Sequence, residues 1–414
     1  MQKLGAGNGL RSRGGVVIAI LFVVFFLGNS DNQMISPLLP LMAREYGMET
    51  GDVGRLIGPA YAMAAALVAL IVGPASDRFG RRRFLLYGSG LFGASLILVW
   101  CIKDIHVLAL TRFFTGLAAG TFSTCSTAYV GDHFPYERRG SAMSIVQSGY
   151  FAALVIGVPA GAGLGHWFGW RSGFVLFGCV SIAALVLIWT LLPEDRHKLA
   201  EQHLSDNITR RFDNIRVAFQ GSARIAAVTG GFFVSAGFAG FIYYLGSWLN
   251  GAFGLNPGEV SLLFIVIGIA SLIGAIAAGP VADRVGKRSV AIAATLALAV
   301  LLVLIPRFGW GAWLFISFLA ASVAYAFRQG PLQALATGLV PSRAMGSLVA
   351  ARITASQIGI AASTAVCGYL FKRFGYGAVG VFSMVMTLGS VVCVYLMKEP
   401  VTQMERKEDR AAED

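Results

Sequence analysis

The chain has 414 residues, of which 56% are hydrophobic and only 13% charged, and its mean hydropathy is +0.69. A soluble domain carries about 25% charged residues, so this composition excludes a soluble domain. The formal net charge of +12 does not indicate nucleic-acid binding, because the basic residues lie in short clusters between apolar runs. The sequence therefore predicts an all-α membrane protein that crosses the bilayer many times.

Apolar segments of about 20 residues, the length that crosses the hydrocarbon of a bilayer, follow one another along the whole chain. The stretch 193–224 holds most of the charge outside these segments and divides them into two sets of six. We therefore expect an N-terminal six-helix bundle over 1–192, a cytoplasmic central loop over 193–224, and a C-terminal six-helix bundle with a short cytoplasmic tail over 225–414. The predicted spans are 15–40, 53–75, 84–101, 107–130, 141–165, 173–192, 225–250, 259–281, 289–306, 311–337, 346–370 and 378–397.

Lysine and arginine are concentrated in every second loop between these spans. With a cytoplasmic N-terminus, the inner loops hold most of the basic residues and the outer loops hold few, as the positive-inside rule requires. We expect both termini in the cytoplasm. We also expect the protein to be a monomer in the lipid bilayer of a cell membrane, and we expect that membrane to be a bacterial inner membrane.

A charged, glycine-led loop occurs twice. GPASDRFGRRR at Gly73–Arg83 returns as GPVADRVGKR at Gly279–Arg288, 206 residues later. A constant offset indicates a duplicated bundle, and two parallel halves with a site between them are an architecture of secondary transporters. Three further landmarks repeat at an offset of 206 or 207: YGMETGDV at 46–53 with FGLNPGEV at 253–260, GSA at 140–142 with GSL at 346–348, and FGW at 168–170 with FGY at 374–376.

With these repeated loops the chain resembles the major facilitator superfamily over essentially its whole length. The resemblance implies twelve transmembrane helices in two pseudo-symmetric six-helix bundles. It also implies that the protein is a transporter and not an enzyme, and that a proton gradient drives it without a cofactor. The segment Gly157–Gly163 and GWRSGF at 169–174 are similar to the proton antiporters of the drug and sugar-efflux branch. Val158 departs from that pattern, because those exporters more often have glycine directly before the proline at position 159.

The repeated loops also predict a conformational latch. Asp77 sits near helix ends, where a carboxylate can face the positive end of a helix dipole, and the resemblance implies the helix over 346–370 as its partner. Arg81 is expected to reach Asp132, whereas Gly338 stands at the matching place in the second half. The alternative is that the arginines only enforce topology. The latch residues are Gly73, Asp77, Arg78, Gly80, Arg81, Asp132, Asp283 and Arg284.

Four ionisable residues lie inside predicted spans, where each charge costs roughly 2.5–3.5 kcal/mol at a helix centre. Asp31 and Arg112 lie at similar depths, about 13 Å and 9 Å from the outer side, so we expect an ion pair. We interpret Asp31 as the proton carrier, and the resemblance links Arg112 to proton coupling. The alternative is a static salt bridge. Arg328 and Arg352 have no acidic residue in the second-half spans, which favours an anionic substrate, unless Arg328 is only structural or Arg352 extends to the cytoplasm.

Polar side chains inside the other spans are candidates for the substrate site, and each is alternatively a helix-packing residue. None of the histidines forms a cluster with metal-ligand spacing, and no Walker motif occurs, so we expect no metal and no direct use of ATP. The predicted substrate-binding residues are Asn32, Gln33, Tyr61, Gln147, Tyr150, Tyr243, Tyr244, Arg328, Gln329 and Gln357.

The leading functional prediction is a proton-coupled secondary transporter that works by alternating access and exports a small amphipathic or anionic organic compound by proton antiport. The alternatives are a proton symporter that imports an organic anion or a sugar derivative, and a lysolipid transporter. A membrane sensor that no longer transports is disfavoured, because a sensor needs no proton carrier. A membrane enzyme is disfavoured too, because no nucleophile–base arrangement occurs in the sequence.

Overall fold

The structure is a computed structural model that describes residues 7–134, 136–193, 221–339 and 345–397. In these residues it contains twelve helices that are long and apolar enough to cross a membrane, and no strand. The prediction of an all-α, twelve-span membrane protein is therefore confirmed. Most of the predicted central loop, 194–220, lies outside the described residues.

The first half comprises α1 (Gly7–Glu45), α2 (Thr50–Phe79), α3 (Arg81–Leu98), α4 (Ile105–His133), α5 (Tyr136–Ala152), the π-helical η2 (Ala153–Gly157), α6 (Val158–Phe168) and α7 (Arg171–Leu191). The second half comprises α10 (Ser222–Phe253), α11 (Pro257–Val285), α12 (Lys287–Leu304), α13 (Ala312–Thr337), α14 (Met345–Phe374) and α15 (Tyr376–Leu396). Short 3₁₀ turns, η1 (Val99–Cys101) and η3 (Ile305–Arg307), extend α3 and α12.

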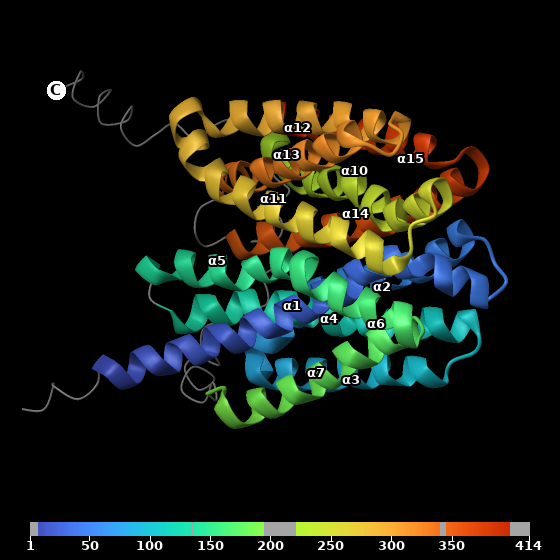
Figure 1. Cartoon of the computed structure of the whole chain (residues 1–414). Helices are drawn as coiled ribbons and strands as arrows, with labels where there is room; N and C mark the ends of the chain where they lie inside the picture. Colours follow the sequence, from blue (N-terminus) through green and yellow to red (C-terminus); the bar gives the residue numbers. More distant parts are fainter. Residues whose placement is uncertain (1–6, 135, 194–220, 340–344, 398–414) are drawn as a thin grey trace, which may run out of the picture.

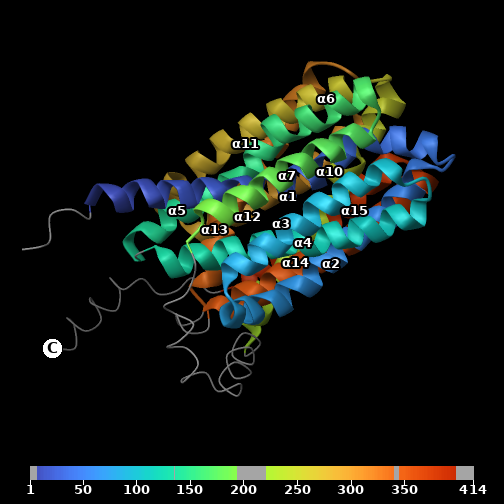
Figure 2. The ribbon, with the colours of Figure 1, turned by 90° about the horizontal axis from the view of Figure 1, so that it is seen from below.

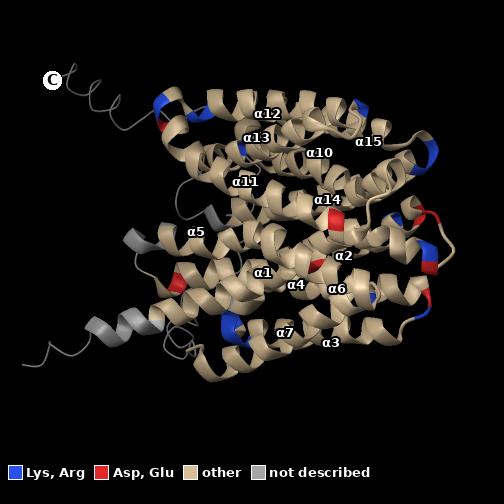
Figure 3. Ribbon diagram, in the orientation of Figure 1, with Lys and Arg blue, Asp and Glu red and all other residues tan. Residues whose placement is uncertain are grey.

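The two halves lie one above the other in Figure 1, with the blue-to-green first half below and the yellow-to-red second half above. Figure 2, turned by 90°, shows the helices running side by side along one common direction. The helix α1 begins and α15 ends at the same end of the bundle, which we call the termini side; the opposite end is the far side. Charged residues lie mostly at these two ends and leave the middle of the bundle almost free of them (Figure 3).

The repeated loops are built alike. A single glycine separates α2 from α3 and another separates α11 from α12; Gly80 has φ +94° and Gly286 has φ +100°. L-residues rarely adopt such φ values, so each reversal of the chain needs the glycine of its motif.

Two predicted spans differ in detail from the helices observed. The helix α1 continues through Pro40 to Glu45 instead of ending at 40. A proline leaves a carbonyl of the preceding turn without its helical N–H partner, and α1 tolerates this while packed against its neighbours. The span over 141–165 is not one regular helix, because the π-helical η2 separates α5 from α6 just before Pro159. Proline has no N–H to donate, and such wide turns are one of the standard causes of a bend.

The two halves meet most closely on the far side, where α2 packs against α14 almost backbone to backbone. A Cβ atom at Gly51 would overlap the carbonyl oxygen of Gly368, and one at Gly58 would lie 3.0 Å from the Cβ of Thr364. Lys372 of α14 donates to Asp52 of α2 at 2.7 Å. We call this contact the far-side seam. It closes the space between the halves on that side.

The helices α1 and α10 join the halves in a similar way. The Ser36 hydroxyl donates to the carbonyl oxygen of Ile242 at 2.7 Å and accepts from the N–H of Gly246 at 3.0 Å. Because both bonds use backbone groups of α10, they fix the height of α1 against α10.

On the termini side the glycines of the repeated loops are not in tight contact. A Cβ at Gly73 would meet its nearest neighbour, Thr124, at 3.8 Å, and one at Gly279 would have nothing within 4 Å. Gly73 is therefore not a point of close helix approach in this conformation. The close approach between the two halves is at the opposite end of α2.

Candidate functional site

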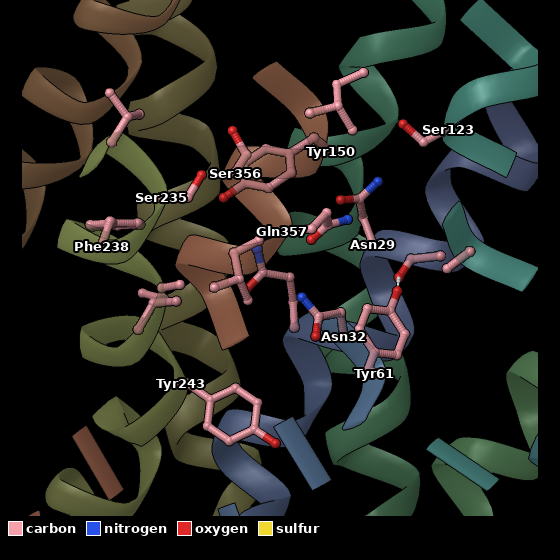
Figure 4. Close-up of a pocket in the computed structure, with 18 of the residues that line it drawn as sticks. Asn29, Asn32, Tyr61, Ser123, Tyr150, Ser235, Phe238, Tyr243, Ser356 and Gln357 are labelled. Atoms are coloured by element: carbon pink, nitrogen blue, oxygen red, sulfur yellow. Dashed lines mark hydrogen bonds between the residues drawn. The ribbon is translucent and has the colours of Figure 1, made fainter. Parts of the chain in front are cut away.

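A cavity of about 350 Å³ lies between the two halves and is lined by α1, α2, α4, α5, α10, α13 and α14. Side chains from both halves point into it (Figure 4). Of the described lining residues, Arg352 is the one that carries a full charge, and none is acidic. The polar lining consists mainly of six amides, Asn29, Asn32, Gln33, Gln329, Gln333 and Gln357, and four tyrosines, Tyr61, Tyr150, Tyr243 and Tyr325.

The structure brings seven of the ten predicted substrate residues to this cavity and leaves three outside it. Gln147 is exposed on α5 and does not line the cavity. Tyr244 is buried in the far-side seam, where its hydroxyl donates to the carbonyl oxygen of Thr364 at 2.9 Å. Arg328 lies behind the cavity wall. The seven that line the cavity are Asn32, Gln33, Tyr61, Tyr150, Tyr243, Gln329 and Gln357.

The predicted ion pair is present. Nη1 of Arg112 lies 2.8 Å from each carboxylate oxygen of Asp31, and both side chains are 0% exposed. A buried charge is tolerated when it is paired, and this pair also satisfies both oxygens of the carboxylate. The remaining guanidinium nitrogens, Nε and Nη2, have no hydrogen-bond partner in the described structure. They lie near aromatic faces, with Cζ 4.8 Å from the Tyr61 ring centre and 5.6 Å from that of Phe174.

Tyr61 connects this pair to the cavity. Its ring contacts the Arg112 guanidinium, its hydroxyl donates to the carbonyl oxygen of Gly28 at 3.1 Å, and it is itself part of the cavity lining. A Cβ at Gly116 of α4 would overlap the carbonyl oxygen of Tyr61, so this glycine lets α4 approach α2. Tyr61 therefore contacts both the buried ion pair and the cavity.

Arg328 is also 0% exposed, but it differs from Arg112 in having no acidic partner in the described structure. Nη2 donates to the carbonyl oxygen of Val234 at 3.1 Å, while Nε and Nη1 have no hydrogen-bond partner. Cζ lies 5.1 Å from the Tyr325 ring centre, and that ring faces Phe238 at 4.1 Å. The prediction that Arg328 binds substrate directly is not supported, because the wall formed by Val234 and Tyr325 separates it from the cavity.

Arg352, for which extension to the cytoplasm was the alternative, lines the cavity. It donates from Nη1 to the side-chain oxygen of Gln333. Its stem packs on Gly231 of α10, where a Cβ would lie 2.8 Å from Cγ of Arg352. The geometry therefore favours a cavity-facing Arg352.

Several lining residues were missed in the sequence. Asn29 and Ser36 recur with the predicted Asn32 at helical spacing on one face of α1, and Gln333 follows the predicted Gln329 by four residues on α13. This spacing was a usable signal. Ser235 and Phe238 carry no comparable signal, because each stands alone among apolar or small residues. Ser123 lies in TFSTCST at 121–127, where several hydroxyl side chains follow one another and none is singled out.

One contact predicted among the latch residues is present, that of Arg81 with Asp132. Arg81 donates from Nε to Asp132, and from Nη1 to the Ser76 hydroxyl at 3.1 Å. Arg78 is exposed, with its guanidinium 5.3 Å from the Phe79 ring centre. The side chain of Asp77 lies outside the described residues, and in the second loop Asp283 and Arg284 are exposed.

Comparison with known proteins places the chain in one family. The sequence model of the Major Facilitator Superfamily matches residues 21–248 and 227–413. The chain is 28% identical over 404 residues to an uncharacterized MFS-type transporter, YwfA, of Bacillus subtilis (strain 168), with 96% of this chain and 95% of that protein covered. It is 25% identical over 379 residues to a second such protein of that strain, YceJ, with 90% and 94% covered.

Solved structures are similar in fold. A D-xylose-proton symporter superposes with a TM-score of 0.75 at 18% identity, covering 93% of this chain and 97% of that one. The inward-open conformation of the xylose transporter XylE from E. coli gives a TM-score of 0.72 at 18% identity, covering 92% and 95%. At this identity the likeness concerns the fold alone. Since the family matches span both halves, the chain belongs to the Major Facilitator Superfamily of membrane transporters.

Proposed function

We propose that this protein is a proton-coupled secondary transporter that exports a small amphipathic or anionic organic compound by proton antiport. The observation that carries the proposal is the Asp31–Arg112 pair, which is fully buried and lies against the cavity-lining Tyr61. A single proton is enough to neutralise a carboxylate in that place.

Protonation of Asp31 would remove the attraction that holds Arg112 and leave one net positive charge in the bundle. Asp31 and the lining residues Asn32 and Gln33 are neighbours on α1. A shift of α1 on protonation would therefore alter the cavity, and binding in the cavity would alter the cost of protonation. Proton and substrate are then linked through their different affinities for two conformations.

The orientation of the protein is part of the proposal. We place the termini side in the cytoplasm of a bacterial inner membrane, on the bias of lysine and arginine toward the loops of that side. Because the far-side seam is closed, the cavity in this conformation would serve the cytoplasm. An exporter loads its substrate in this state.

Import by proton symport is the second candidate, and the lining favours it in one respect. Six amides and four tyrosines offer many neutral hydrogen bonds, which suit a sugar derivative, and two solved relatives are described as xylose transporters. A lysolipid is disfavoured, because a cavity of about 350 Å³ is at the small end of the range for ligand pockets.

The test uses the full chain in proteoliposomes that contain a pH-sensitive dye and carry an imposed pH gradient. Candidate compounds are added on one side, and proton flux is recorded. Proton movement opposite to the substrate supports antiport, and movement in the same direction supports symport. We expect Asp31→Asn to bind substrate and exchange it but to lose proton-driven accumulation. Accumulation by Asp31→Asn at the unmodified rate would exclude Asp31 as the proton carrier.

A further inference from the structure

We propose that Arg352 and Gln333 form an anchor for a single anionic group, a carboxylate or sulfonate, on a substrate whose planar body packs against Tyr325 and Phe238. This rests on the proposed function and narrows its substrate from amphipathic or anionic compounds in general to small organic monoanions with a planar body. Cations are excluded from the same cavity.

The described lining of the cavity carries an unbalanced positive charge. Arg352 lines it, the described lining contains no acidic side chain, and the partner of Arg352 is the neutral amide of Gln333. A neutral partner leaves the positive charge uncompensated in a partly dehydrated space. An anion would supply the missing charge, and a guanidinium can bind a carboxylate through two parallel hydrogen bonds.

The stem of Arg352 is held in place by contacts with α10. Its Cγ and carbonyl oxygen both lie within 3 Å of where a Cβ at Gly231 would be, so α10 and α14 touch at this residue. One turn further along α14, the Ser356 hydroxyl donates to the carbonyl oxygen of Gly231 at 3.1 Å. The stem of Arg352 is thus held where α14 packs against α10, while its guanidinium borders the cavity. A pre-positioned arginine loses little freedom when it binds an anion.

An aromatic wall lies further along the cavity, about two helical turns from the level of Gln333 and Gly231. The rings of Tyr325 and Phe238 are stacked at 4.1 Å, and the Tyr150 hydroxyl donates to that of Tyr325 at 3.4 Å. Arg328 lies behind Tyr325 with two guanidinium nitrogens that lack partners. A second buried positive charge raises the potential of this end of the cavity and repels a cationic ligand. The apolar rings contribute contact area for a planar body.

The experiment measures thermal stabilisation of the purified full chain in detergent by matched probes. The probes are sets that share one ring system and differ in charge, such as 4-hydroxybenzoate with 4-hydroxybenzamide, and indole-3-acetate with tryptamine. We expect the acids to raise the melting temperature and the amide and amine not to do so. In Arg352→Gln the half-saturating acid concentration should rise by about tenfold to a hundredfold, the range for a hydrogen bond to a charged group.

Two further variants make the result specific. Arg373→Gln removes the same charge from the same helix at an exposed position outside the cavity and should bind the acids as the unmodified chain does. Gln333→Glu keeps the guanidinium but places a carboxylate beside it, so it should also lose acid binding. This variant tests the anchor even where Arg352→Gln fails to fold.

Equal stabilisation by acids and amines, or no stabilisation by any acid, would overturn the proposal. Unchanged acid binding in both Arg352→Gln and Gln333→Glu would do the same. The proton-coupling proposal fails separately: Asp31→Asn with unaltered proton-driven accumulation would refute it and leave the anion anchor standing.

Discussion

The two halves place buried charge in opposite ways. The first half holds Asp31 and Arg112 as an ion pair, and the repeat offset of 206 puts Gly237 and Phe318 at the matching places in the second half. The second half instead holds Arg328, which matches Phe122 of the first half and has no acidic partner in the described structure.

Under the proposed proton coupling, this difference separates two tasks that a coupled transporter needs. A buried carboxylate–guanidinium pair changes its net charge when it takes up one proton, so it can report the proton gradient. An arginine without an acid stays positive at any physiological pH, so it can only supply a constant field. The chain therefore confines the variable charge to one half and the constant charge to the other.

The largest effect is expected from Arg112→Met. It leaves the Asp31 carboxylate buried without its cation, which should lower the free energy of unfolding by about 3–5 kcal/mol and abolish proton coupling. The melting temperature in detergent measures the first change. The double variant Asp31→Asn with Arg112→Met should recover most of the stability, and a double variant as unstable as the single one would contradict this account.

A smaller effect is expected from Tyr61→Phe. The ring stays over Arg112, but the hydrogen bond to the carbonyl oxygen of Gly28 is lost, which should slow proton flux in proteoliposomes by about two- to tenfold. Tyr376→Phe in the second half is the matched control, because the Tyr376 hydroxyl also donates to a backbone carbonyl oxygen, that of Phe241, at 2.7 Å. It should leave proton flux unaltered, because Tyr376 does not line the cavity. Equal slowing in both variants would remove the distinction between the halves.

The far-side seam joins the halves and gives a third test. Lys372→Glu should repel Asp52 and increase far-side labelling of a Thr364→Cys variant by about two- to fivefold, as for loss of an exposed ion pair. A membrane-impermeant maleimide measures this against the background of the five native cysteines. The charge swap with Asp52→Lys should restore the original labelling. Labelling that stays high in the swap would show that Lys372 acts through something other than this pair.

The smallest effect on stability is expected from Arg328→Met. Replacing a buried cation that lacks an acidic partner by an apolar side chain of similar length should leave the melting temperature unchanged or raise it slightly. Acid probes should bind only a few-fold more weakly, because Arg328 lies behind the wall. A destabilisation as large as that of Arg112→Met would mean that the two arginines are held in equivalent ways.

The sequence sufficed for positions along the helix axes but not for rotations about them. Hydropathy located the spans, and depth alone paired Asp31 with Arg112, because both charges are too costly to remain separate in lipid. Arg328 and Gln329 show the limit. Neighbouring residues point about 100° apart on a helix, and here Gln329 lines the cavity whereas Arg328 does not. The same uncertainty made Gln147 and Tyr150 equal candidates on α5, whereas only Tyr150 lines the cavity.

The glycine contacts of α2 and α14 have a consequence for how quickly the protein can change state. Where α2 and α14 touch through Gly51 and Gly368, the contact is between the two backbones, so separating these two residues requires little repacking of rotamers. Such a contact is a close approach of two helix backbones at glycine. The two backbones can separate and re-form this contact without a change of register. A methyl group added at either glycine would hold the two helices apart.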